Sequence, residues 1–149
     1  FKALAGFQAP LGKLAVSGDN DGEPDALKLA MMGSGVTLID GGAQVLHRGG
    51  DAIAVAGIGE GTSDVAGMAA KFRSEQFVIA LTHRPSRVVD VRIAEAGNGG
   101  QWADLTLAGH THGGQIQIAG RTILSLDSLT SVLSVEPVTA ITRPSNCER

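Results

Sequence analysis

Cysteine, long apolar runs and clusters of basic residues are almost or entirely missing from this chain. Its only cysteine is Cys147, so a single chain can build neither a disulfide framework nor a zinc site made of thiolates. No apolar run reaches the length that crosses a bilayer. With a formal net charge of −3 and no run of lysine or arginine, the chain offers no case for non-specific binding to nucleic acid or for attachment to an anionic membrane.

The composition is that of a folded protein with many tight loops. The 149 residues are 43% hydrophobic and 18% charged, which supplies enough apolar side chain for one core and argues against disorder. The 21 glycines often stand in pairs or beside strand-like runs, a pattern that suits a sheet-rich protein. No repeat or linker divides the chain, so we expect a single domain over residues 1–149.

Short apolar runs bounded by glycine, proline and polar residues predict a mixed α/β (α+β) fold. The expected helices are 25–32, 68–73 and 86–95. The expected strands are 13–17, 36–39, 43–47, 52–58, 77–82, 104–108, 115–118 and 121–126. Because the strands 36–39, 43–47 and 52–58 follow one another through short turns, we expect them to form an antiparallel ladder.

Three of the expected strands lead directly into loops that carry the side chains of metal ligands. The three segments are LAVSGDND (14–21), VIALTHRP (78–85) and LTLAGHTHGG (105–114). In layered α/β proteins the loops at the C-terminal ends of strands converge, and sites are built there. We therefore expect one neighbourhood to hold the ligand-type residues of all three loops, namely Asp19, Asp21, His83, His110 and His112. Carboxylate and imidazole ligands without thiolate suit manganese, iron or zinc better than calcium or magnesium.

The pair His110 and His112 has the spacing of two ligands at the end of a strand. Residues two apart in an extended segment point to the same side, and the neighbouring glycines let the backbone turn tightly. The alternative is that both are ordinary surface histidines in a turn. For His83 the alternative is a cap on the helix that follows, and His47 is expected on the surface or at a sheet edge because no ligand-type residue accompanies it.

The acidic loop after the first strand has two other interpretations. Ser17, Asp19 and Asp21 are spaced like the first ligands of a calcium-binding EF loop. However, the twelfth position is Lys28 and a strand precedes the loop, which excludes that site. The loop could instead be a solvated turn that caps the helix beginning at Asp25.

Together these segments carry a family resemblance. GHTHGGQI (109–116), LTHRP (81–85) and LAVSGDND (14–21) resemble the calcineurin-like metallophosphoesterases, and GHTHGGQ resembles a bacterial branch of that superfamily. The segment 35–59 is also similar in spacing and character. The resemblance implies an αββα fold, a β-sandwich flanked by helices, with two metal ions at the strand ends. It also implies hydrolysis of phosphomonoesters or phosphodiesters by metal-activated water.

Two departures from the family pattern change what we expect. The Asp-x-His and Gly-Asp-x-x-Asp motifs that open the family's sequence are missing, so the chain resembles the C-terminal portion of a longer phosphoesterase and lacks the N-terminal strands. The third family motif, Gly-Asn-His followed by Asp or Glu, here reads Gly18-Asp19-Asn20-Asp21. Asp19 thus stands at the position of a metal-binding asparagine, and Asn20 at that of the histidine that stabilises the transition state. We expect these two residues to act in catalysis.

The resemblance distributes the remaining site residues unevenly between two metal ions. His83, His110 and Asp19 match ligands of the second metal. His112 matches a ligand of the first metal, whose other protein ligands lie in the missing part. One site is therefore expected to be nearly complete and the other nearly empty, with the negative charge of Asp19 partly replacing the lost bridging carboxylate. Arg84 is expected to offer charge to a substrate phosphate.

The sequence thus predicts a metal-dependent phosphoesterase that acts on a small-molecule phosphoester with manganese, zinc or iron. The alternative is a non-catalytic metal-binding remnant, or a fragment that needs a partner chain to complete its site, and a plain sheet-rich interaction domain is a third class. Missing strands would expose a sheet edge and an apolar face, so we expect a two-fold homodimer. The N-terminal FKALAGFQAP does not resemble a signal peptide, and we expect a bacterial cytoplasmic location.

Overall fold

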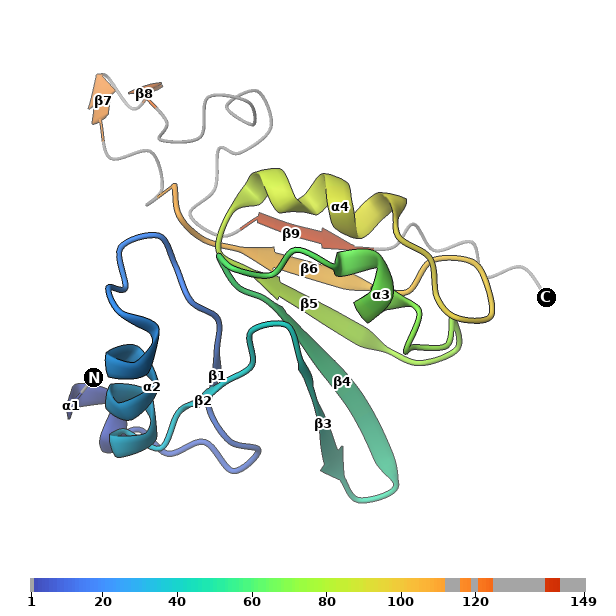
Figure 1. Ribbon diagram of the computed structural model, residues 1–149, viewed down its shortest axis with the longest axis horizontal. Helices are drawn as coiled ribbons and strands as arrows, with labels where there is room; N and C mark the ends of the chain where they lie inside the picture. The colour runs from blue at the N-terminus through green and yellow to red at the C-terminus, as the bar shows by residue number, and fades with distance from the viewer. Residues whose placement is uncertain (1, 112–115, 119–120, 125–138, 143–149) are drawn as a thin grey trace.

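A five-stranded mixed sheet forms the centre of the computed structural model (Figure 1). The structure describes residues 2–111, 116–118, 121–124 and 139–142, with side chains for residues 3–111. The strands, in their order across the sheet, are β3 (Ala43–Arg48), β4 (Asp51–Ile58), β5 (Val78–Thr82), β6 (Leu105–Ala108) and β9 (Thr139–Thr142). β4, β5 and β6 run parallel, whereas the outer strands β3 and β9 are antiparallel to their neighbours. The C-terminal ends of the three central strands therefore meet at one edge of the sheet.

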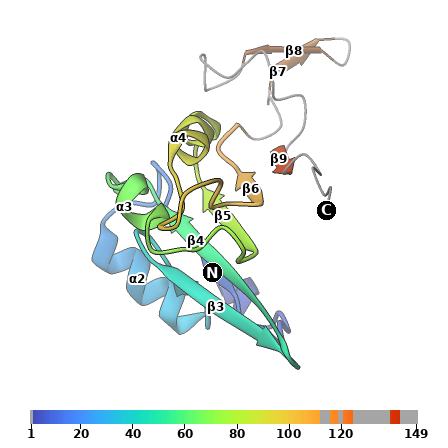
Figure 2. The ribbon, with the colours of Figure 1, turned by 90° about the vertical axis from the view of Figure 1, so that its right-hand side faces the viewer.

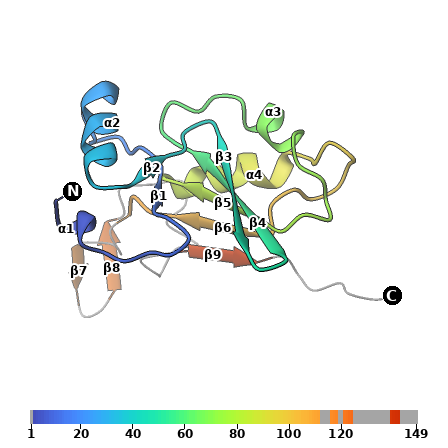
Figure 3. The ribbon, with the colours of Figure 1, turned by 90° about the horizontal axis from the view of Figure 1, so that it is seen from below.

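Two helices cover one face of this sheet, α3 (Val65–Ala69) and α4 (Val88–Ile93), the second after a 3₁₀ turn at Pro85–Arg87 (Figures 1 and 3). Every second residue of β5 is fully buried, as the two-residue period of a strand requires. Val78 and Ala80 belong to the same buried cluster as apolar side chains of both helices. Their small size lets the helices lie close to the sheet.

Trp102 is the largest fully buried side chain among the described residues, with only 1% of its surface exposed. Its ring stacks on Phe72 at a centroid distance of 5.5 Å, which is the offset arrangement that aromatic pairs prefer. The indole Nε1 donates a 3.0 Å hydrogen bond to the carbonyl of Val91 in α4. The tryptophan thus fixes α4 against the loop that leads into β6.

A smaller layer lies beside the main sheet (Figures 1 and 2). It consists of β1 (Leu14–Ala15), α2 (Pro24–Gly33) and β2 (Thr37–Leu38), and β1 and β2 pair in parallel. Proline suits the first helical position because its missing N–H has no partner there in any case. The helix buries Leu27 and Met31 against these strands and makes a second apolar cluster.

The two layers are joined where the chain after β2 runs beside the end of β4. Gly41 donates its backbone N–H to the carbonyl of Gly57, and Gly57 donates to the carbonyl of Gly42, both at 2.9 Å. A Cβ on Gly57 would lie 2.3 Å from the carbonyl oxygen of Ile39, so only glycine fits there. Because the bridge between Asp40 and Gly57 is parallel, β1 and β2 run in the same direction as the central strands. The loop after β1 is thereby brought to the edge where β5 and β6 end.

Most of the predicted elements are confirmed, and one pairing is wrong. The mixed α/β class, the helix 25–32, the β3–β4 hairpin and a second hairpin, β7 (Ile116–Ile118) with β8 (Arg121–Leu124), all agree with the structure. The prediction that segment 36–39 joins an antiparallel ladder is wrong, because β2 pairs in parallel with β1. The chain between β1 and β2 contains the helix α2, and a helical crossover of this kind connects parallel strands. The structure also contains a short helix that the sequence did not indicate, α1 (Lys2–Ala5).

The expected helix 68–73 begins earlier, at Val65, because the Asp64 side chain caps it. The Asp64 carboxylate accepts a 2.7 Å hydrogen bond from the backbone N–H of Gly67. None of the helices in the described part of the chain has the length and apolar character needed to cross a membrane.

Candidate metal centre

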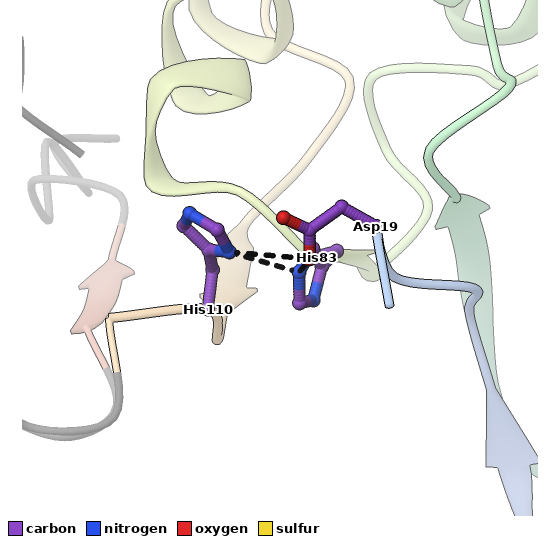
Figure 4. Close-up of side chains that lie close together, drawn as sticks. All are labelled: Asp19, His83 and His110. Atoms are coloured by element: carbon purple, nitrogen blue, oxygen red, sulfur yellow. Dashed lines mark hydrogen bonds and ion pairs between the residues drawn. The ribbon is translucent and has the colours of Figure 1, made fainter. Parts of the chain in front are cut away.

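Three loops at one edge of the sheet bring an aspartate and two histidines together (Figure 4). Asp19 lies in the loop after β1, His83 directly follows β5, and His110 follows β6. One ligand atom from each residue lies within 4.8 Å of the other two. Residues separated by up to 91 positions (110 − 19) in the sequence thus form a single cluster.

The spacing of the three ligand atoms suits a shared divalent cation. Nε2 of His83 lies 2.8 Å from Oδ1 of Asp19 and 3.0 Å from Nδ1 of His110, and the last two atoms are 3.6 Å apart. Ligands about 2.1 Å from a metal ion are separated by about 3.0 Å at a right angle and about 3.4 Å at a tetrahedral angle. The three separations fall around these values. Two imidazoles and a carboxylate are a donor set that binds zinc, manganese or iron.

Hydrogen bonds alone account poorly for this cluster. Nε2 of His83 contacts both Asp19 and His110, but one ring nitrogen carries at most one proton. If Nε2 is protonated and donates to Asp19, it cannot accept a hydrogen bond from His110; if it accepts from His110, it has no proton to donate to Asp19. A cation, in contrast, satisfies the lone pairs of all three atoms at once.

His110 is held in an unusual backbone conformation. Its φ is +71°, and every other described residue with a positive φ is a glycine. Such a conformation costs a non-glycine residue about 1–3 kcal/mol and is concentrated at functional sites. The side chain is 7% exposed, and its Nε2 is buried without a hydrogen-bond partner among the described residues. The backbone N–H of Gly109 donates to the carbonyl of His83 at 3.1 Å, which ties the two histidine loops together. A buried imidazole kept at this cost fits a metal-binding role.

Gly18 has no side chain, and the His83 ring occupies the space where one would lie. A Cβ on Gly18 would lie 2.8 Å from Cε1 and 3.0 Å from Nδ1 of that ring. Asp21 shapes the same loop, because its carboxylate accepts a 2.6 Å hydrogen bond from the backbone N–H of Gly18. The structure thus places Asp21 beside the three-residue cluster, as support for the loop that carries Asp19.

The Asp19 carboxylate is surrounded by groups that favour its ionised form. The hydrogen bond with His83 has the largest effect and holds the pKa of Asp19 below its ordinary value. Desolvation partly raises this pKa, whereas the electrostatic effects of His110 and Arg84 lower it. An aspartate that stays ionised at neutral pH is available as an anionic ligand.

Arg84 lies between two carboxylates. Its Nη2 donates to Oδ2 of Asp19 at 3.1 Å, and its Nε donates to both oxygens of Glu60 at 2.9 and 3.0 Å. Sequence reasoning missed Glu60, although a signal was present. Glu60 comes two residues after β4, just as Asp19, His83 and His110 come shortly after their strands.

Two further sequence-predicted residues are placed as follows. Asn20 is exposed and its Nδ2 donates to Oδ1 of Asp19 at 3.2 Å, so its amide borders the cluster. His47 is exposed on β3, an outer strand of the sheet, as expected. The alternative role of the acidic loop as a helix cap is not supported, because the N-cap residue of α2 is Glu23 and its side chain makes no capping bond. His112 lies outside the described residues.

A cavity of about 510 Å³ opens beside the cluster. Asp19 is part of its wall, and the rest comes from α2, from β2 and from the loops after β1, β2 and β4, including Asp40, Glu60 and Thr62. The volume is within the range of small-molecule sites. The cluster therefore borders a space that can take the organic part of a small ligand.

The chain is similar in sequence to a known protein. No protein-family model and no solved structure matches the chain. The chain is 32% identical over 122 residues to a protein of Bacillus subtilis (strain 168) described as "Uncharacterized metallophosphoesterase YkuE". The match covers 77% of this chain and 40% of the relative, so the chain spans less than half of that protein's length. This similarity supports a relationship to the metallophosphoesterase superfamily.

Proposed function

We propose that this protein hydrolyses small phosphomonoesters or phosphodiesters in a metal-dependent reaction. The observation that carries the proposal is the convergence of Asp19, His83 and His110, with ligand atoms 2.8 to 3.6 Å apart, in a chain similar to a metallophosphoesterase. We expect the metal to be manganese, zinc or iron, because the donor set combines imidazole and carboxylate without thiolate.

Each of the three residues would hold the ion through a defined atom. Asp19 supplies Oδ1, His83 Nε2 and His110 Nδ1, because these are the atoms that face one another. A bound divalent cation would polarise a phosphoryl oxygen and lower the pKa of water in its shell. His112 is proposed as a ligand of a second ion, whose remaining ligands are not among the described residues.

Asn20 and Arg84 are proposed to act on the substrate. Asn20 borders the cluster, but an amide cannot transfer a proton to a departing alkoxide, and general acid catalysis is typically worth about 10²–10⁴ in rate. The rate of hydrolysis should therefore be reduced less for esters with a good leaving group, such as nitrophenolate, than for alkyl esters. Arg84 is proposed to offer charge to the phosphate, although its guanidinium already contacts Asp19 and Glu60. The neighbouring cavity would take the organic substituent.

Several broader expectations stay predictions. They are the membership in the GHTHGGQ branch, the correspondence to the C-terminal portion of a longer phosphoesterase, the single domain over residues 1–149, a bacterial cytoplasmic location and a homodimer. Size-exclusion chromatography at several protein concentrations tests the dimer. A monomer whose elution does not depend on concentration contradicts it.

The proposed activity is tested with nitrophenyl phosphate and bis(nitrophenyl) phosphate in the presence of manganese or zinc. We expect turnover that is abolished by a chelator and by His110→Ala. His47→Ala is the matched control, because His47 is an exposed histidine on an outer strand, and this variant should keep full activity. Turnover that survives His110→Ala contradicts the proposed site.

A second function is favoured by the uneven ligand set. The described residues supply three ligands to one ion, and the family resemblance assigns only His112 to the other. A non-catalytic metal-binding protein, or one that needs a partner chain to complete its site, would bind metal through Asp19, His83 and His110 without turnover. Metal binding that is lost in His110→Ala, combined with absent hydrolysis of both nitrophenyl esters, would identify this second function.

A further inference from the structure

The two oxygens of the Asp19 carboxylate face different partners. Oδ1 lies 2.8 Å from His83 and 3.6 Å from His110, whereas Oδ2 accepts a hydrogen bond from Arg84 at 3.1 Å. The other end of the Arg84 guanidinium is held by both oxygens of Glu60. A continuous chain of charged groups thus runs from Glu60 through Arg84 to the candidate metal ligand.

We infer that Arg84 is a positioning residue for the metal site, which fixes Asp19 as a ligand through Oδ1 alone, and that Glu60 holds Arg84 in place. The inference rests on the proposed metal site. A free carboxylate rotates about its terminal bond and can turn either oxygen toward a cation. By binding Oδ2, the guanidinium leaves one oxygen for the ion, as second-layer hydrogen bonds do for carboxylate ligands in general.

The geometry of arginine suits this task better than that of lysine. Its guanidinium is planar and presents donors in fixed directions, so it can join two carboxylates on separate loops. Arg84 and Asp19 are 33% and 28% exposed, and Glu60 is 37% exposed. The pairs are therefore partly shielded from solvent and less screened than fully exposed pairs.

The charge of Arg84 makes the inference testable by the sign of an effect. The guanidinium of Arg84 repels a nearby metal ion. If Arg84 had no positioning role, this repulsion would weaken metal binding, and removal of the side chain would strengthen it. A positioning residue has the opposite effect, because its removal releases the ligand. Glu60 offsets the repulsion by neutralising Arg84 on the side away from Asp19.

The test measures metal affinity rather than turnover. Isothermal titration with Zn²⁺ and Mn²⁺ is performed on the wild type, Arg84→Ala, Arg84→Lys and Glu60→Gln, and the visible absorption of bound Co²⁺ reports the coordination. We expect Arg84→Ala to weaken binding about 10–100-fold and to change the Co²⁺ spectrum. Lysine should restore part of the affinity, and Glu60→Gln should cause a smaller loss. Arg73→Ala, which removes another arginine–glutamate pair outside the site, is the matched control and should leave the affinity unchanged.

A double-mutant comparison isolates the route through Asp19. In the Asp19→Asn variant, position 19 no longer has a carboxylate for Arg84 to orient. Adding Arg84→Ala to this variant should therefore leave the zinc affinity unchanged or raise it. Zinc is used for this comparison because such sites bind it more tightly than manganese. Equal or tighter metal binding by Arg84→Ala in the wild-type background overturns the inference. If that variant instead raises only the KM for nitrophenyl phosphate, then Arg84 is a substrate contact. Unchanged metal binding in His110→Ala would contradict the metal site itself, which is a separate result.

Discussion

Asp19 is the residue on which the candidate site depends most. It stands where the family resemblance places a neutral asparagine, and its Oδ1 is the atom that both histidines approach. Its pKa is held below the ordinary value, chiefly by the hydrogen bond with His83, so the side chain is anionic at neutral pH. A negative ligand matters here because no other carboxylate joins the described cluster.

Replacement of Asp19 by asparagine is expected to weaken metal binding markedly. The amide oxygen keeps the shape of the ligand but loses its charge, and the ion would then be held by neutral groups only. Metal content measured by mass spectrometry after equilibration with zinc or manganese checks this. Unchanged metal content in Asp19→Asn would show that the carboxylate is not a ligand.

Gly18→Ala is expected to weaken metal binding about tenfold or more without unfolding the protein. The added methyl group would meet the His83 ring at 2.8 Å, so the imidazole must shift from the position in which it faces Asp19 and His110. Gly61→Ala is the control, because a Cβ at that position in a neighbouring loop meets nothing within 4 Å. Zinc titration compares the two variants, and circular dichroism checks their folding. Equal zinc affinities would mean that the ring position tolerates the methyl group.

At the level of elements, the sequence predicted the site through a repeated pattern of apolar strand and polar loop. That pattern placed Asp19, His83 and His110 correctly at one sheet edge, because parallel strands end on the same side. It did not reveal Glu60, which was not recognised as a member of the pattern, or the positive φ of His110, because backbone conformation at a histidine follows from the surrounding fold. The pairing of β2 was also missed, because a two-residue strand has too little pattern of its own to define its partner.

Gly57→Ala tests the junction between β4 and the chain after β2. The new methyl group would lie 2.3 Å from the carbonyl oxygen of Ile39, so the backbone contact must open. We expect a loss of about 1–3 kcal/mol in the free energy of unfolding, measured by urea denaturation, as is typical of overpacking. Gly50→Ala, in the β3–β4 turn with open space around it, should leave stability nearly unchanged. Because the junction also positions the Asp19 loop, zinc affinity should fall in Gly57→Ala alone. Equal stability of the two variants would contradict this account of the junction.

At the scale of the whole molecule, the cluster connects two layers with separate apolar cores. Asp19 belongs to the layer of β1, β2 and α2, which is packed around Leu27 and Met31. The two histidines follow strands of the main sheet, whose core is built around Trp102. In the described residues the layers also meet through the backbone contacts at Gly57 and through the hydrogen bond that the backbone N–H of Glu60, after β4, donates to the hydroxyl of Ser17 (3.2 Å). A metal ion at the cluster would add a link between them.

Metal binding is therefore expected to stabilise the folded protein as a whole. Free zinc at about 100 times its dissociation constant should raise the free energy of unfolding by about 2.7 kcal/mol, because an unfolded chain does not hold the three ligands together. For a chain of this size that corresponds to an increase of roughly 5–10 °C in Tm. Thermal unfolding followed by circular dichroism, with and without zinc and then with a chelator, measures the change. His110→Ala should show no zinc-dependent shift, whereas His47→Ala should shift like the wild type, since His47 lies on an outer strand away from the cluster. A zinc-dependent rise in Tm of the same size in His110→Ala would show that the stabilising metal binds at another site. The cluster of Asp19, His83 and His110 would then not be a metal-dependent link between the layers.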